Sequence, residues 1–284
     1  HFYLFTMTSV ALTVGCTLIA FSPTASLLFI LAFKKAQLVI IVTISAFAFL
    51  LSSLLAATIW NVLPNSIQSS PFILIPLGVA SQCLLRLLFV HGYFKIENLI
   101  HSSIEQSRAA SSAAHQTINE TALFRLELND WACGIASGIG FGGMHAIMLY
   151  GTLLSSEASN LGTLYQPSCP AVPSLVLSAT NAFIFSILDI LIMLISFYGM
   201  RIRRGDRENS ETTIQLSGTN RFDRSQWILL SSICFHLGAA LATVFNLNDD
   251  GCYVSLPLLL GTIVCCAIFF GKYVLPFYSF PRQD

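Results

Sequence analysis

Four polar side chains lie near the middle of long apolar stretches and are the residues best placed to do chemistry: Arg86, His145, Asp189 and His236. A charged group at such a depth in a bilayer costs at least about 2.5–3.5 kcal/mol, so it normally faces a bundle interior or a water-filled cavity. Groups of this kind can form a proton relay, an ion site or a ligand counter-ion. They can also be structural, each paired with a polar partner that fixes helix packing.

Asp189 and His236 are expected at the same depth, because they lie near the middles of consecutive antiparallel stretches. An ionised carboxylate alone in hydrocarbon is costly, and a protonated imidazole or another donor reduces that cost. We therefore predict that both side chains face the bundle interior in direct or water-mediated contact. The alternative is a neutral Asp189 that bonds only within its own chain. His145, taken alone, is interpreted as a packing residue.

Three glycines four residues apart, Gly134, Gly138 and Gly142, form a second candidate site. Four residues advance a helix by about 400°, so the three positions form one nearly straight groove. Membrane helices associate largely through close packing, and a groove without side chains lets another helix approach. That helix can belong to this chain or to another subunit, and the sequence leaves both possibilities open.

The eight cysteines do not form a metal-binding pattern. Cys169 and Cys252 lie in short segments between apolar stretches, where they form either a disulfide or two free thiols. We predict no metal and no cofactor. The other six are interpreted as small apolar side chains within the apolar stretches: Cys16, Cys83, Cys133, Cys234, Cys265 and Cys266.

Motifs of several enzyme classes are absent from the sequence. It contains no H-E-x-x-H, no Walker loop and no G-x-S-x-G. It also lacks the Tyr-Asp and Gly-x-Gly-Asp pair that an intramembrane aspartyl protease needs. We therefore predict no catalytic residue.

The elements that position these residues follow from the composition. Of 284 residues, 55% are hydrophobic and only 10% are charged, and the mean hydropathy is +0.73. Soluble domains carry about 25% charged residues, so this chain has too little polar surface for a soluble enzyme. Fourteen basic and fourteen acidic residues balance, so the net charge indicates no nucleic-acid partner.

Seven stretches reach the length of about 20 apolar residues that a helix needs to cross a bilayer. They predict an all-α, polytopic membrane protein with seven transmembrane helices in a single domain, 1–284. The strands of a membrane barrel would alternate apolar and polar residues, and these stretches do not. The seven stretches are residues 5–33, 38–63, 72–94, 131–154, 172–200, 227–245 and 253–275.

Basic residues give the orientation. Thirteen of the fourteen lie in alternate loops or at the C-terminus, on one side of the membrane, and the opposite loops contain none. By the positive-inside rule the C-terminus is cytosolic and the N-terminus is lumenal or extracellular. The two longest loops, 95–130 and 201–226, are then cytosolic, and so is Asn119, in the only N-x-S/T sequon.

Several of these segments resemble the anterior-pharynx-defective family, the seven-span scaffold subunit of gamma-secretase. Residues 15–23 read GCTLIAFSP, similar to the family's GCTxxAFxP, and residues 54–60 read LLAATIW, similar to LLASxxW. Gly134, Gly138 and Gly142 match the family's GxxxGxxxG in span four, and His236 matches its span-six histidine.

The resemblance implies a non-catalytic subunit that stabilises and positions presenilin, the subunit with the catalytic aspartates. Nicastrin and a small presenilin-enhancer subunit are the other implied partners, and the glycine groove is the implied assembly motif. The complex cleaves type I membrane proteins such as Notch and amyloid precursor. The implied location is the endoplasmic reticulum, the Golgi and the plasma membrane or endosomes.

Two polar positions depart from the family pattern. The family has a second histidine in span five, where this chain has Asp189 at or within one residue. Span three of the family carries Gln-Glu followed by Arg, whereas residues 86–91 here read RLLFVH. The chain is thus similar to a divergent member, and replacing Asp189 with His is expected to be tolerated.

Two other classes share parts of this pattern. A seven-helix receptor has the same span count and orientation, but the chain lacks Asp-Arg-Tyr after span three and Asn-Pro-x-x-Tyr in span seven. A transporter of protons or small solutes is suggested by Arg86, Asp189 and His236. The absence of an internal repeat weakens that interpretation.

Overall fold

The computed structural model describes residues 2–32, 35–68, 70–110, 130–157, 164–212 and 224–276. Asn119 and parts of both predicted loops, 111–129 and 213–223, lie outside these ranges. Within them the chain is almost entirely helical, as the composition predicts. The helices are α1 (Phe2–Leu27), α2 (Ala36–Val62), α3 (Asn65–Gln68), α4 (Pro71–Ala110), α6 (Asp130–Ala146), α7 (Thr152–Glu157), α8 (Ser174–Thr212), α9 (Arg224–Ala242) and α10 (Cys252–Phe269).

Short helical turns of other pitch extend four of these helices. A π-helical turn, η1 (Leu28–Ala32), follows α1, and another, η2 (Ile147–Gly151), joins α6 to α7. A 3-10 turn, η3 (Thr243–Leu247), ends α9, and a π-helical turn, η4 (Phe270–Val274), ends α10. These additions lengthen the helices without breaking them, so each forms one continuous span.

The seven predicted spans are confirmed, because seven helices in the described part are long and apolar enough to cross a membrane. Their lengths run from 22 to 32 residues. Backbone groups in hydrocarbon must be satisfied within the chain, and a helix does this by itself. The spans are Val10–Leu31, Ala36–Val62, Pro71–Ile100, Asp130–Ser156, Ser174–Gly205, Arg224–Leu247 and Cys252–Val274.

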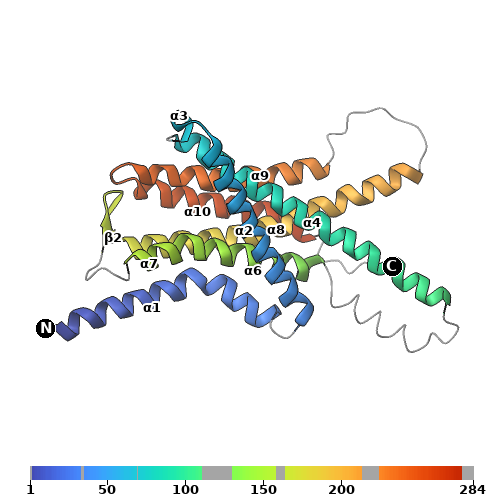
Figure 1. The fold of residues 1–284 in the computed structure, drawn as a ribbon, viewed down its shortest axis with the longest axis horizontal. Helices are drawn as coiled ribbons and strands as arrows, with labels where there is room; N and C mark the ends of the chain where they lie inside the picture. Colours follow the sequence, from blue (N-terminus) through green and yellow to red (C-terminus); the bar gives the residue numbers. More distant parts are fainter. Residues whose placement is uncertain are drawn as a thin grey trace.

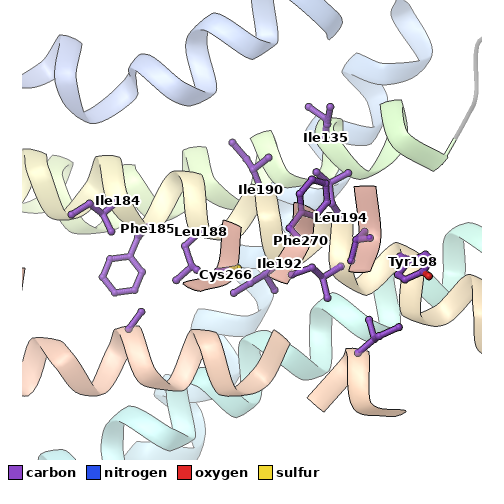
Figure 2. Packing of buried hydrophobic residues seen from close by; sticks show 14 of the residues in the cluster. Ile135, Ile184, Phe185, Leu188, Ile190, Ile192, Leu194, Tyr198, Cys266 and Phe270 are labelled. Atoms are coloured by element: carbon purple, nitrogen blue, oxygen red, sulfur yellow. The ribbon is translucent and has the colours of Figure 1, made fainter. Parts of the chain in front are cut away.

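The fold is built around α6 and α8. In the most apolar window of each span, 78% of α8 and 61% of α6 is buried inside the chain, against 17% for α1 and 22% for α10. A cluster of buried apolar side chains joins α6 and α8 to α9 and α10 (Figure 2), including Ile135, Leu188, Ile228 and Cys266. The remaining spans surround this pair, with α2 and α4 crossing it obliquely (Figure 1).

The end of the bundle where α2 gives way to α3 also carries a β-hairpin, and we call it the hairpin end (Figure 1). Strand β1 (Tyr165–Gln166) pairs antiparallel with β2 (Cys169–Pro173). Of the two possibilities for Cys169 and Cys252, the structure has the disulfide, with 5.4 Å between the Cα atoms. The hairpin is thereby fixed to the start of α10.

At the opposite end, α4 and α8 continue well past the predicted membrane boundaries at residues 94 and 200. Helix α4 runs to Ala110 and α8 to Thr212 (Figure 1). No proline interrupts residues 95–110 or 201–212, and their polar residues tolerate a helix in water. The first parts of both predicted loops are therefore helical.

Candidate functional site

The four polar residues predicted near mid-membrane come together in one buried cluster. They arise from four different helices: Arg86 from α4, His145 from α6, Asp189 from α8 and His236 from α9. Arg86 and Asp189 are each 1% exposed, His236 is 2% exposed and His145 is 9% exposed. Because each helix contributes one group, the cluster couples all four helices.

Asp189 lies at the centre and accepts a hydrogen bond on each carboxylate oxygen. Arg86 Nη2 donates to Oδ1 at 2.5 Å, and His145 Nδ1 lies 2.8 Å from Oδ2. The guanidinium is always charged, so it holds the carboxylate in its ionised form. This geometry favours an ionised Asp189 over the neutral one, with His145 as a second donor.

His236 is held by Arg86 and has no hydrogen bond to Asp189 in the described part of the chain. Its Nδ1 lies 3.4 Å from Arg86 Nη1. Arginine only donates, so Nδ1 accepts and carries no proton. Both side chains are buried in the bundle, and of the predicted direct or water-mediated contact the direct hydrogen bond is not formed. Arg86 contacts both of them, Asp189 through Nη2 and His236 through Nη1.

Aromatic rings pack against this cluster. His145 lies between Phe49 and Phe185, with centroid distances of 5.3 and 4.8 Å. The guanidinium of Arg86 lies 5.0 Å from the centroid of the Phe141 ring. In such surroundings a charge interacts strongly with its partners, and losing one partner is costly.

The glycine groove of α6 is filled by α8 of the same chain. A Cβ atom at Gly138 would lie 2.6 Å from Ile190 Cα, and one at Gly142 would lie 2.9 Å from the Ser186 carbonyl oxygen. At Gly134 the nearest atom would be Leu194 Cδ2 at 2.8 Å. Ser186 Oγ also donates to the Gly142 carbonyl oxygen at 3.0 Å. The helix that fills the groove therefore belongs to this chain, which is one of the two possibilities that the sequence left open.

Sequence reasoning missed a tighter contact on the other side of α6. A Cβ atom at Gly140 would lie 2.0 Å from Ser45 Oγ and 2.3 Å from the Val42 carbonyl oxygen, both of α2. Gly140 is two residues from Gly138, which turns it to the opposite face. The sequence did contain a sign of this contact, because Gly140 is an additional glycine that does not belong to the series Gly134, Gly138 and Gly142.

A second ionic cluster, also missed, lies at the end of the bundle opposite the hairpin. Arg201 of α8 makes a bidentate pair with Asp130, the first residue of α6, and Arg201 Nη2 donates to Glu97 of α4 at 3.0 Å. Arg204 Nη1 lies 3.5 Å from the same Glu97. The sequence analysis placed these arginines in the predicted loop 201–226, and the continuation of α4 and α8 brings them beside Glu97.

The arrangement is suited to holding helices together. Both oxygens of Asp189 are engaged by side chains from two other helices. Among the described residues, no group of three or more His, Cys, Asp or Glu side chains could hold a metal ion. The cluster is chemically an internal ion pair with two imidazole partners.

Comparisons with known proteins agree with this architecture. The sequence model of the Aph-1 protein family matches residues 11–275, which include nearly all of the seven spans. The chain is also 26% identical over 269 residues to the gamma-secretase subunit APH1-like of Arabidopsis thaliana, and the match covers 94% of each chain. Because the matched region covers nearly all of the seven spans, the chain belongs to the Aph-1 family.

Proposed function

We propose that this chain is the non-catalytic scaffold subunit of a gamma-secretase complex, in which it stabilises and positions presenilin. The observation that carries the proposal is the Aph-1 match across residues 11–275. The relative from Arabidopsis thaliana is named as a gamma-secretase subunit and matches over nearly its whole length. The proposed partners are presenilin, nicastrin and the presenilin-enhancer subunit. The proposed substrates are type I membrane proteins such as Notch and amyloid precursor.

The distribution of burial supports a scaffold role. The α6–α8 pair is close-packed through glycine, and the buried ion cluster attaches α4 and α9 to it. The outer helices instead expose large apolar side chains, such as Phe47 and Leu54 of α2 and Leu88 of α4. A rigid centre with apolar outer faces is suited to holding other membrane helices at fixed positions.

The glycine groove contributes to assembly indirectly in this proposal. Gly134, Gly138 and Gly142 contact α8, so they set the shape of the core and not the contact with another subunit. Arg86, His145, Asp189 and His236 then fix where α4 and α9 lie on that core. A partner bound to the outer helices recognises a surface whose geometry these residues determine.

The orientation and location belong to the same proposal. By the positive-inside rule, the distribution of basic residues favours a cytosolic C-terminus and a hairpin end in the lumen or outside the cell. The Cys169–Cys252 disulfide at the hairpin end supports this orientation, since disulfides persist in oxidising compartments. We place the chain in the endoplasmic reticulum, the Golgi and the plasma membrane or endosomes.

Affinity purification tests the proposed function. The tagged chain, extracted from its own membranes in a mild detergent, is expected to retain a presenilin-type protease, a nicastrin and a presenilin enhancer in equal amounts. Mass spectrometry identifies the partners, and an unrelated seven-span protein is the control. Recovery of the chain alone, or with a G protein, would reject the proposal.

A further inference from the structure

A cavity of about 400 Å³ lies at the hairpin end, between the η2–α7 segment, α8, β1 and η3. Small-molecule sites in proteins usually occupy about 300–1,000 Å³. Its lining combines leucines with uncharged polar residues, and no described charged residue lines it. The lining residues are Leu149, Thr152, Leu153, Ser156, Gln166, Ser174, Leu177, Ser178, Asn181 and Asn246.

Hydroxyl groups in this lining already donate hydrogen bonds to backbone carbonyl oxygens. Thr152 Oγ1 donates to the Met148 carbonyl oxygen at 2.6 Å, and Ser178 Oγ donates to the Leu149 carbonyl oxygen at 2.9 Å. A hydroxyl has one proton to donate and two lone pairs that can accept. What Thr152 and Ser178 retain for a ligand is therefore the capacity to accept hydrogen bonds.

Two amides in the lining add further acceptors. The side-chain oxygens of Asn181 and Asn246 are buried and have no hydrogen-bond partner among the described residues. A buried carbonyl oxygen without a donor is unfavourable. A half-turn about χ2 exchanges the oxygen and nitrogen positions of the amide, so each oxygen can be turned toward the cavity. The lining therefore offers more acceptors than donors, with four hydroxyl and three amide oxygens against the N–H groups of Gln166, Asn181 and Asn246.

The charge around the cavity favours a cation. The segments at this end, 152–157, 164–173 and 246–252, contain no Lys or Arg. Asp249 and Asp250 are exposed there, and the Asp250 N–H donates to the Pro167 carbonyl oxygen, one residue from Gln166 of the lining. Exposed carboxylates at this end of the bundle, with no basic residue in the same segments, attract a positive group and repel an anion.

We propose that this cavity binds the primary ammonium group of an ethanolamine phospholipid. An ammonium carries three donors and one positive charge, which match the acceptor-rich lining and the exposed carboxylates at this end of the bundle. The cavity lies at the ends of the spans, at the level of lipid headgroups, and in the proposed orientation this is the extracytoplasmic leaflet. Leu149, Leu153 and Leu177 contact the methylene groups of the lipid.

Choline phospholipid separates the proposed donor contacts from general lipid binding, because its trimethylammonium group has the charge but no N–H. The full chain, purified in mild detergent and depleted of lipid, is titrated with phosphatidylethanolamine or phosphatidylcholine, and bound lipid is counted by native mass spectrometry. We expect about a tenfold or greater preference for ethanolamine, equivalent to one charge-assisted hydrogen bond. Singly and doubly N-methylated ethanolamine lipids are expected to bind with intermediate affinity. Equal binding of the two headgroups would overturn the proposal.

Variants locate the site. Asn181→Leu and Asn246→Leu are each expected to reduce ethanolamine-lipid binding about tenfold and to leave choline-lipid binding unchanged. Asn61→Leu, an exposed asparagine near the hairpin end of α2 and outside the lining, is the matched control. Unaltered binding by both cavity variants would reject the site. The N-methylation series on the unmodified chain keeps the proposal testable if a variant fails to fold. Neither experiment requires presenilin, so the result is independent of the proposed scaffold role.

Discussion

Asp189 of α8 accepts a 2.5 Å hydrogen bond from Arg86 of α4, although 103 positions separate them in the sequence. Both side chains are 1% exposed, so the ion pair is enclosed by protein. The two long helices meet again toward the end opposite the hairpin, where Phe197 of α8 packs against Tyr93 and Phe94 of α4 and Arg201 donates to Glu97. The buried pair is therefore one of several contacts that hold α4 against α8, and it is the most deeply enclosed of the ion pairs between them.

Replacing one member of the pair is expected to lower the stability of the fold, because the other member stays buried without its partner. Arg86→Met leaves the Asp189 carboxylate buried with only the His145 donor, and Asp189→Leu leaves the guanidinium without its anion. Each is expected to destabilise the fold by about 3–5 kcal/mol, whereas the double variant loses much less than the sum. Reversible unfolding in mixed micelles gives the free energy of unfolding of the parent chain, the two single variants and the double variant, which together form a double-mutant cycle. Additive losses would show that the two groups act independently.

Replacing Asp189 with His, which the family resemblance suggested would be tolerated, is expected to destabilise the chain. Histidine carries no negative charge, so Arg86 and His145 would lose the anion that they share. Asp189→Glu keeps the charge and is the matched control. The combination Arg86→Leu with Asp189→His is expected to recover part of the loss, because it removes the uncompensated guanidinium. A melting temperature for Asp189→His equal to that of the parent chain would contradict this account.

Filling the glycine groove is expected to disturb the chain itself before it affects any partner. Leu at Gly138 would force α8 away from α6, because the first added carbon already overlaps the Ile190 backbone. Gly261→Leu on α10 is the control, since nothing lies within 4 Å of a Cβ at that position. We expect insertion of both variants, and reduced thermal stability and reduced presenilin recovery for Gly138→Leu only. Normal stability combined with lost recovery would indicate instead that the groove contacts another subunit.

The disulfide predicts the reactivity of the cysteines at the hairpin end. In the native chain Cys169 and Cys252 should resist a membrane-impermeant maleimide until a reductant is added. The double variant Cys169→Ser with Cys252→Ser is expected to lose about 2–4 kcal/mol of stability. Peptide mapping under non-reducing conditions identifies the link. Labelling of both thiols without reductant would exclude the disulfide.

The orientation makes a prediction about Asn119. If the segment between α4 and α6 is cytosolic, the Asn119-Glu120-Thr121 sequon is never glycosylated in the native chain. A sequon inserted at the tip of the β-hairpin, between β1 and β2, should be glycosylated in microsomes. A shift in gel mobility that is removed by a glycosidase reports glycosylation. A glycan at Asn119 would show that the chain has the opposite orientation in the membrane.

Much of the fold was determined by the sequence. Span number and approximate span boundaries follow from hydropathy, because a helix crossing hydrocarbon satisfies its own backbone and needs only enough apolar residues. The inward placement of Arg86, His145, Asp189 and His236 follows from the same cost argument, since charge and imidazole groups avoid lipid. Gly134, Gly138 and Gly142 indicated a close helix contact because their spacing places them on one face.

Tertiary structure decided which groups meet. Helical periodicity defines faces but not neighbours, so it could not show that Arg86 contacts both Asp189 and His236, or that α8 occupies the glycine groove. The same limit applied to Gly140 against α2, and to Arg201, whose carboxylate partners lie 71 and 104 positions away. The physical reason is that the order of helices around a bundle depends on contacts between distant segments, and hydropathy along one segment carries no information about them.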